Sequence, residues 1–293
     1  MSSMLGVDLG ATFIRLCRID EHGGELIRFR TPPGYSAARI LTPELISLMP
    51  VSRSIFAVGL SCAAGLGSAG IVCEWPTRPD WVGVPLVNII ERVTAKNVLS
   101  ADDGTCAALW EHDLEPRGPI STTACLSIGT GLAVGIVRGG RLINTGEGSA
   151  TIGHLALSDL NLPCKCGKKG CLQTVLSVEG LELVRREFGT MALRGALSRI
   201  FELLRENYQV DRVVFSGGGV SRFGGSFFLT EAAQALRGAR SPRIVVSRSP
   251  SLSALGGSLL LVLEASRKYC RSHWVRSIRH SFKRFRRLDE VQG

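Results

Sequence analysis

One arrangement of predicted elements occurs twice along this chain. In the first copy, strands are predicted at residues 4–8, 13–19 and 25–30. In the second copy, strands are predicted at residues 122–128, 132–137 and 141–143. Each meander contains a glycine turn between its first two strands, and helices and strands alternate after it. This repeat predicts two related α/β domains that face each other across a cleft.

The remaining pattern sets the expected domain boundaries. Helices are predicted at residues 37–48, 86–94, 105–112, 172–188, 193–208, 226–236 and 252–265, and strands at 54–60, 97–99, 212–215 and 243–246. We expect an N-terminal α/β domain at residues 1–113, joined by the helix at 252–266, and a C-terminal α/β domain at residues 114–251. Residues 267–293 form a basic tail.

Positive charge is concentrated in that tail. The 293 residues carry a formal net charge of +10, and residues 267–287 contain nine Lys or Arg and no Asp or Glu. Because the rest of the chain carries only about +1 (+10 minus nine), a nucleic-acid-binding function is not indicated for the whole protein. The longest strongly apolar stretch, residues 253–263, is interrupted by Gly256, Gly257 and Ser258 and is shorter than the ~18 residues that cross a bilayer. The N-terminus lacks the basic start of a secretion signal, so we expect a cytoplasmic protein.

Three glycine turns are candidates for binding phosphate groups. They contain the residues Asp8, Gly10 and Thr12, then Gly129, Thr130 and Gly131, and finally Gly217, Gly218 and Gly219. Backbone N–H groups beside glycine can approach phosphate closely, and the carboxylate of Asp8 suits a hydrated Mg²⁺ ion. Taken singly, each of the first two is better explained as an ordinary hairpin turn. Their occurrence at equivalent positions of the two meanders favours a magnesium nucleotide.

A cluster of cysteines predicts a metal site. His154, Cys164, Cys166 and Cys171 follow the pattern His-x9-Cys-x-Cys-x4-Cys. Three thiolates and one imidazole suit a closed, tetrahedral, structural Zn²⁺ site that leaves no position for a catalytic water. The alternative is a flexible loop of unpaired cysteines beside an unrelated histidine. The other cysteines are expected to be reduced, because the chain has an odd total of nine cysteines and a secretion signal is not indicated.

The tail has a helical pattern of its own. Val275, Ile278, Phe282 and Phe285 recur at helical spacing among Lys and Arg residues. Such a basic amphipathic helix could contact an anionic surface or an acidic partner. A solvated extension that packs loosely on the body is the alternative.

These motifs, in this order, resemble the ROK family of sugar kinases and sugar-responsive repressors. The resemblance extends over roughly residues 4–265 and rests on the segments GVDLGAT at 6–12, DDGTCAAL at 102–109, IGTG at 128–131, IGH at 152–154, CKCGKKGC at 164–171 and GGGV at 217–220. It implies the actin-like (RNase H-like) ATPase fold, with two α/β domains around a cleft. It also implies ATP and Mg²⁺ as cofactors, a structural Zn²⁺, and phosphorylation of a hexose or hexose-like sugar, usually at the primary hydroxyl at C6.

The resemblance also implies roles for individual residues. Asp103 matches the catalytic base of the family, because a carboxylate can accept the proton of the attacking hydroxyl. Asp102 occupies the position of a sugar-binding Asn, and His154 would bind both zinc and sugar. Without the resemblance, Asp102 and Asp103 would be interpreted as a loop and helix N-cap, and the cap and base roles can coexist.

Two departures from the family pattern affect the sugar site. Thr151 stands where family kinases have Glu before Ile-Gly-His, and Gln173 stands where they have Glu after Gly-Cys-Leu. Gln173 can still accept a hydrogen bond from a sugar hydroxyl, whereas Thr151 is too short to reach as Glu does. Thr77 also stands where the family often has Asn. Sites built to bind hydroxyl groups discriminate strongly between substrates when a hydrogen-bond partner is missing. These changes therefore predict altered substrate choice, weak activity or none.

The expected partners are a small-molecule sugar and ATP. We expect no DNA-binding domain of the family's repressor type, because the first glycine turn begins near residue 6. Only about 45 residues separate Cys171 from Gly217, fewer than is usual in the family, which leaves a homodimer open. Two alternatives to a kinase remain: a non-catalytic sugar- or nucleotide-binding sensor, and a protein that acts mainly through its basic tail on a membrane surface or a nucleic acid.

Overall fold

The computed structural model describes residues 3–49, 55–115, 121–143, 150–236, 241–265 and 271–291. The chain divides into two compact units. Unit 1 comprises Met1–Cys106 and Ala254–Gly293, and unit 2 comprises Ala107–Ser253. Each unit contains a five-stranded sheet with helices packed on it, so the predicted α/β class is confirmed.

The sheet of unit 1 begins with the predicted meander. Its strands are β1 (Ser3–Leu9), β2 (Phe13–Asp20), β3 (Gly23–Arg30), β4 (Ile55–Cys62) and β7 (Val98–Asp102), in the order β3-β2-β1-β4-β7. The strands β1, β2 and β3 are antiparallel, whereas β4 and β7 run parallel to β1. A small hairpin of β5 (Gly65–Leu66) and β6 (Val72–Glu74), which the sequence pattern does not predict, follows β4.

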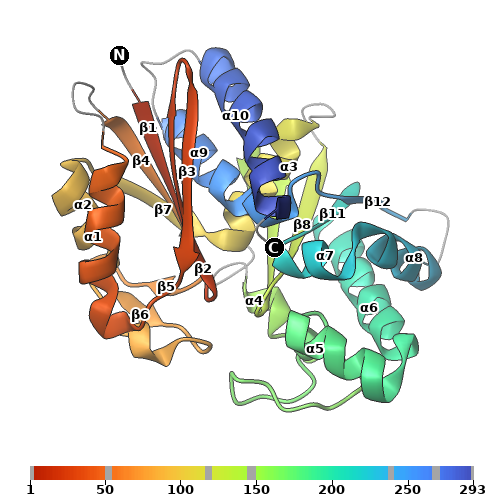
Figure 1. Ribbon diagram of the computed structural model, residues 1–293. Coiled ribbons are helices and arrows are strands. Elements are labelled where there is room, and N and C mark those ends of the chain that lie inside the picture. The colour runs from red at the N-terminus through yellow and green to blue at the C-terminus, as the bar shows by residue number, and fades with distance from the viewer. Residues whose placement is uncertain are drawn as a thin grey trace. The chain divides into compact units, whose positions relative to one another are not determined.

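Helices lie on both faces of this sheet (Figure 1). The helices α1 (Ala37–Ser47) and α2 (Leu86–Thr94) lie on one face, and α9 (Ser253–Ala265) and α10 (Arg271–Val291) on the other. Glycines allow α9 to approach the strands closely, since a Cβ atom on Gly59 would lie 1.9 Å from the carbonyl oxygen of Ser258. A Cβ atom on Gly6 would lie 2.9 Å from Leu259. Asp8 is two residues beyond Gly6 and therefore points to the same face, at the end of β1.

Unit 2 repeats this plan. Its strands are β8 (Thr122–Ile128), β9 (Leu132–Arg138), β10 (Arg141–Leu142), β11 (Arg212–Ser216) and β12 (Arg243–Val246), in the order β10-β9-β8-β11-β12. Its helices are α3 (Asp103–Leu114), which begins in unit 1, α4 (Ala150–Gly153), α5 (Val178–Leu183), α6 (Thr190–Tyr208), α7 (Gly218–Phe223) and α8 (Gly225–Ala235). The aromatic side chains Phe201, Phe215 and Phe228 join α6, β11 and α8 in one buried core.

One predicted helix is divided into several pieces. The sequence predicts a helix at residues 172–188, but the structure has a 3-10 turn at Leu172–Thr174, α5, and a π-helical turn at Val184–Phe188. The hydroxyl of Ser177 accepts a hydrogen bond from the N–H of Gly180 and so caps a new helix start. Gly189 follows the last turn with φ of +68°. A side-chain cap and a left-handed glycine therefore set boundaries that hydrophobic periodicity does not reveal.

The tail forms the helix α10, which packs on β2 and β3. Its apolar residues are buried: Trp274, Val275, Ile278, Phe282 and Phe285. Gly24 leaves room for this packing, because a Cβ atom there would lie 2.8 Å from the ring of Phe285. The described part of the tail is thus not a loosely packed extension, and its apolar face contacts protein. The residues of α10 described as exposed include four basic ones, Arg276, Lys283, Arg284 and Arg286.

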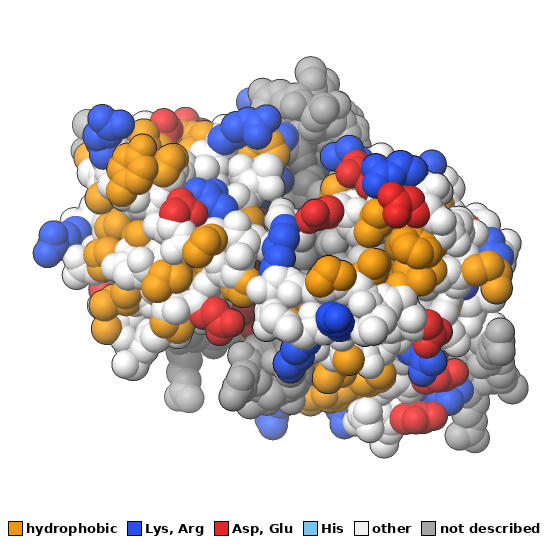
Figure 2. Space-filling model, turned by 90° about the horizontal axis from the view of Figure 1, so that it is seen from below, with side chains coloured by type: hydrophobic (Ala, Val, Ile, Leu, Met, Phe, Trp, Pro, Cys, Tyr) orange, Lys and Arg blue, Asp and Glu red, His pale blue; other side chains and the backbone are white. Residues whose placement is uncertain are grey.

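Charges of both signs are scattered over the face seen in Figure 2, among hydrophobic and uncharged groups. Among the described residues drawn in colour there, neither sign forms an extended patch. Within the described ranges, no helix combines the length and apolarity that a membrane crossing requires.

Candidate functional site

Three carboxylates meet at the carboxyl ends of the parallel strands in unit 1. In the register of the sheet, Asp8 of β1 pairs with Ser61 of β4, and Cys62 of β4 pairs with Asp102 of β7. The carboxylate of Asp8 accepts hydrogen bonds from Ser61 Oγ at 2.9 Å and from Arg15 Nη1 at 3.3 Å. Asp103 follows immediately, as the first residue of α3. The structure thus brings together Asp8, Asp102 and Asp103.

Asp102 caps the helix that Asp103 begins. Its two carboxylate oxygens accept from the N–H of Thr105 at 2.8 Å and from Thr105 Oγ1 at 2.7 Å. Asp103 Oδ1 accepts the N–H of Gly104 at 2.9 Å. The helix cap expected from the sequence is therefore present at Asp102.

The electrostatics of the cluster favour proton uptake at Asp103. Burial, reinforced by the charges of Asp102 and Asp8, raises the pKa of Asp103 to about 7. Burial also raises the pKa of Asp8, against the opposing effect of Arg15. A carboxyl group with a pKa near neutrality can both accept and release a proton at physiological pH, as a general base must.

Sequence reasoning missed two partners of Asp8. Arg15 reaches Asp8 because β1 and β2 pair Asp8 directly with Arg15 across the hairpin. The predicted meander contains this signal, since its register sets cross-strand neighbours. Ser61 lies on a strand more than fifty residues away, and no local pattern reveals its contact.

The two glycine turns of unit 2 lie next to each other. The parallel strands β8 and β11 pair Ser127 with Ser216, so the turns that follow them leave the same edge of the sheet. Gly217 has φ of +93°, and a Cβ atom there would lie 2.4 Å from the carbonyl oxygen of Ile128. Gly129 and Gly218 border open space, because a Cβ atom on either would meet nothing within 4 Å. Both turns expose backbone to which an anion could bind.

The predicted metal ligands also come together. One ligand atom from each of His154, Cys164, Cys166 and Cys171 lies within 4.8 Å of all the others. Cys164 Sγ is 3.5 Å from His154 Nδ1, and Cys166 Sγ is 3.7 Å from Cys171 Sγ. A tetrahedral zinc ion with ordinary bond lengths separates two sulfur ligands by about 3.8 Å and a sulfur from a nitrogen by about 3.5 Å. The donor set and its spacing therefore fit Zn²⁺.

Gln173 contacts this cluster directly. Its Nε2 donates to Cys164 Sγ at 3.0 Å. Burial opposes ionisation of the Cys164 thiol, but hydrogen bonds from the Cys166 backbone and from Gln173 outweigh it and lower the pKa of Cys164. An amide can donate to a thiolate, which a glutamate at this position could not do. The side chain of Thr151 lies outside the described residues.

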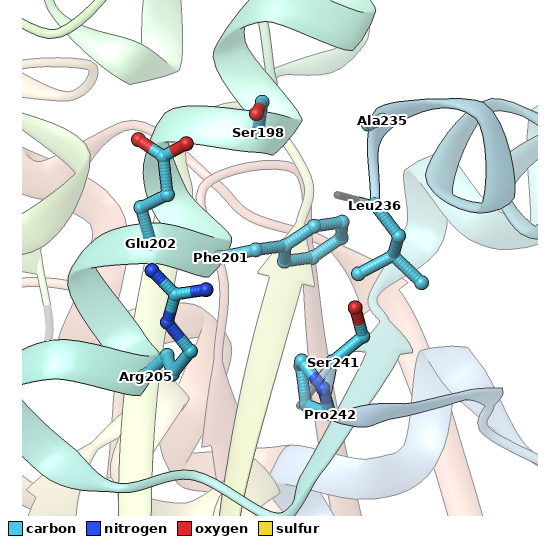
Figure 3. Close-up of a pocket in the computed structure, with 8 residues that line it drawn as sticks. All are labelled: Ser198, Phe201, Glu202, Arg205, Ala235, Leu236, Ser241 and Pro242. Carbon is cyan, nitrogen blue, oxygen red and sulfur yellow. The ribbon is translucent and has the colours of Figure 1, made fainter. Parts of the chain in front are cut away.

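A separate hollow in unit 2 contains none of the predicted site residues (Figure 3). It lies between α6, the end of α8 and the segment before β12, and its volume is about 20 Å³. Phe201 and Leu236 point into it, with Glu202 and Arg205 at one side. Such a space holds about one water molecule, so it is not a candidate substrate site.

Comparison with known proteins decides the family. The sequence signature of the ROK family matches residues 4–218. The chain belongs to the ROK family. The resemblance found in the sequence motifs is thereby confirmed.

Among its relatives, the kanosamine kinase of Amycolatopsis mediterranei is 31% identical over 211 residues, which cover 69% of this chain and 66% of that protein. The glucokinase of Streptomyces coelicolor is 28% identical over 188 residues, 63% of this chain and 59% of that protein. The matched part of this ROK protein thus spans less than two thirds of these relatives.

Solved ROK structures have the same fold. The ROK hexokinase of Thermus thermophilus superimposes with a TM-score of 0.71 at 23% identity, covering 90% of this chain and 99% of that chain. A glucokinase of Streptomyces griseus, in complex with glucose and AMPPNP, gives a TM-score of 0.70 at 19% identity over 87% of this chain and 97% of that chain. These likenesses confirm the actin-like ATPase fold.

Proposed function

We propose that this ROK protein is an ATP-dependent carbohydrate kinase. The γ-phosphoryl group of MgATP passes to the primary C6 hydroxyl of a hexose or an amino sugar. Its relatives support the class, since they include a kanosamine kinase and glucokinases. The observation that carries the proposal is the meeting of Asp103 with Asp8 and Asp102 at the carboxyl ends of the parallel strands, where Asp103 is half-buried. The raised pKa of Asp103, about 7, supports it.

Asp103 acts as the general base in this proposal. Because Oδ1 accepts the N–H of Gly104, we assign the sugar hydroxyl to Oδ2. The hydroxyl oxygen forms a bond to the γ-phosphorus while the bond from phosphorus to the β–γ bridging oxygen breaks. The electron pair of that bond leaves with ADP. The hydroxyl proton moves to Asp103 and is later released to solvent.

MgATP is assigned to the three glycine turns. The proposed residues are Asp8, Gly10 and Thr12 in unit 1, and Gly129, Thr130, Gly131, Gly217, Gly218 and Gly219 in unit 2. Backbone N–H groups of these turns would hold the phosphates. Asp8 would hold the hydrated Mg²⁺ that arrives with the nucleotide, and the mutual repulsion among Asp8, Asp102 and Asp103 supports a cation there.

The sugar is assigned to Asp102, Asp103, His154 and Gln173. Zinc, bound by His154, Cys164, Cys166 and Cys171, would supply structural cross-linking of this loop, because four protein ligands leave no site for a reactive water. His154 would thereby be oriented toward a sugar hydroxyl. Gln173 contributes through its carbonyl oxygen, since its amide nitrogen already donates to Cys164.

A substrate panel tests the kinase. Zinc-loaded protein is incubated with MgATP and one hexose or amino sugar at a time, and ADP release is measured, with Asp103→Asn as the control. We expect release with one class of sugar and none from the variant. The 6-deoxy analogue of the best sugar tests the position of transfer. Turnover of that analogue would contradict phosphorylation at C6.

The pKa of Asp103 predicts a pH profile. A base with a pKa of about 7 is protonated and inactive below that pH. We expect kcat/KM to fall about tenfold for each pH unit below 7 and to reach a plateau above it. A rate that is flat from pH 5 to pH 8, measured on folded protein at saturating MgATP, would contradict the role of Asp103.

The contact between Gln173 and Cys164 favours a second candidate, a non-catalytic sugar- or nucleotide-binding regulator. This side chain is committed in part to the metal loop instead of the sugar. Saturable binding of sugar or MgADP without sugar-dependent ADP release would support this candidate and exclude the kinase.

A further inference from the structure

The turn between β1 and β2 is held by a residue outside every motif. Arg78 lies in the loop between β6 and the 3-10 turn Pro79–Trp81. Its Nη1 donates to the carbonyl oxygen of Ala11 at 3.0 Å, in the turn itself. The same atom donates to the carbonyl oxygen of Thr31 at 3.3 Å, and Nη2 donates to that of Pro32 at 2.5 Å.

All the hydrogen-bonding capacity of this guanidinium group is used. Besides the three carbonyl bonds, Nε donates to Asp80 Oδ1 at 3.1 Å and Nη2 to Asp80 Oδ2 at 3.0 Å. A guanidinium group has five N–H donors, so none remains for a ligand. Arg78 therefore holds the backbone of the turn in place through its hydrogen bonds and does not itself bind phosphate.

The segments that Arg78 joins are linked further to one another. Thr31 donates its N–H to the carbonyl oxygen of Thr12 at 3.0 Å and its hydroxyl to the carbonyl oxygen of Gly10 at 2.6 Å. Asp80 accepts the N–H of Gly34 at 2.9 Å. The indole of Trp81 donates to the carbonyl oxygen of Pro32 at 2.8 Å. Three loops that are distant in sequence are thus joined around one cation.

We propose that Arg78 is a positioning residue for the β1–β2 turn, and that it sets the backbone geometry with which Gly10 and Thr12 receive the phosphates of MgATP. This inference rests on the proposed function for the identity of the ligand. The chemistry requires Arg, because an ammonium group has three donors on a single nitrogen and cannot reach three carbonyls and a carboxylate in one plane. Lysine at this position retains the charge but not the geometry.

The test compares Arg78→Lys and Arg78→Met with Arg138→Met as a matched control. Arg138 is also half-buried and bonds a backbone carbonyl, that of Tyr208, but at the end of β9 remote from the Gly129–Gly131 turn. We expect both Arg78 variants to bind MgADP about tenfold more weakly and to lower kcat by about 10²-fold, since small misplacements of reacting groups carry penalties of this size. Arg138→Met should lower the thermal midpoint without changing MgADP affinity.

Two further measurements separate positioning from simple destabilisation. Hydrogen exchange of the peptide covering residues 9–13 should quicken at least tenfold in Arg78→Met and not in Arg138→Met. Ethylguanidinium added to Arg78→Ala should restore part of the MgADP affinity. Unchanged MgADP affinity and unchanged exchange in the Arg78 variants would overturn the inference, as would full function of Arg78→Lys. Failure of the proposed kinase would appear separately, as absence of sugar-dependent turnover in the unsubstituted protein that still binds MgADP.

Discussion

Replacing Asp103 with Asn is expected to lower kcat by 10²- to 10⁴-fold, the usual contribution of a positioned general base. Asn has nearly the same shape and can still accept the N–H of Gly104. It cannot accept the proton of the attacking hydroxyl. The measurement is sugar-dependent ADP release at saturating MgATP and sugar, which isolates the chemical step from binding.

The stability of the variant supplies the control. The pKa of Asp103 rises from 3.8 to about 7 on folding, so the folded protein binds this proton more tightly than the unfolded chain. The contribution of this bound proton to the stability of the folded protein is complete below pH 3.8 and is lost as the pH rises through 7. At pH 8 the charge on Asp103 is destabilising, and Asp103→Asn should therefore unfold at a higher temperature than the unsubstituted protein.

Together these results would distinguish catalysis from folding. A variant that is inactive but more stable at pH 8 has lost chemistry and kept its structure. A variant that keeps more than a tenth of the activity would show that another group accepts the proton. Asp102→Asn is the matched comparison, since it keeps an oxygen acceptor for the N–H of Thr105 and leaves Asp103 in place. We expect it to alter the KM for sugar more than kcat.

Strand and helix positions were accessible from the sequence because they depend on local pattern. The alternation in the two meanders predicts β1 to β3 and β8 to β10 within a few residues. The helical spacing of Ile278, Phe282 and Phe285 likewise predicts the buried face of α10. What covers that face was not accessible, because Gly24 opens β3 to the helix only through a contact between residues far apart in sequence.

In the candidate site, too, the local features could be predicted from the sequence and the long-range contacts could not. Glycine turns and cysteine spacing are local features, so the sequence alone suffices to predict the turn at Gly217 and the four side chains that the structure brings together at His154. The bond from Ser61 to Asp8 depends on the register of parallel strands, which one sequence does not specify. Arg78 carries no motif at all, since its role consists of carbonyl contacts with loops more than forty residues away.

The second large effect that we expect follows from disrupting the predicted metal cluster. Cys166→Ser should lower zinc affinity by about 10²-fold or more. Loss of a group that hydrogen-bonds to a metal ligand lowers metal affinity by about 10- to 100-fold, and loss of a ligand itself should lower it further. Cys166 is half-buried, so the change adds little strain to the core, in contrast to a change at fully buried Cys171. Metal content after gel filtration and competition with a chromophoric chelator measure the affinity.

The structural consequence should be local to the cysteine loop. Lys165, Lys168 and Lys169 are exposed within it. A zinc ion held by Cys164 and Cys171 would restrain the chain around them. We expect trypsin to cleave there in Cys166→Ser and in chelator-treated protein, and to leave the loop intact in zinc-loaded protein. Added Zn²⁺ should restore resistance to the treated protein but not to the variant.

Cys73→Ser provides the matched control, because Cys73 is an exposed thiol outside the cluster. It should bind one zinc per chain, resist trypsin in the loop and keep the sugar-dependent rate. If Cys166→Ser also kept its zinc and its resistance, the four side chains would not form a metal centre. The proposal that zinc orients His154 toward the sugar requires the loop to lose its contacts with the sugar when the ion leaves. Retained sugar affinity in metal-free protein would therefore contradict that proposal.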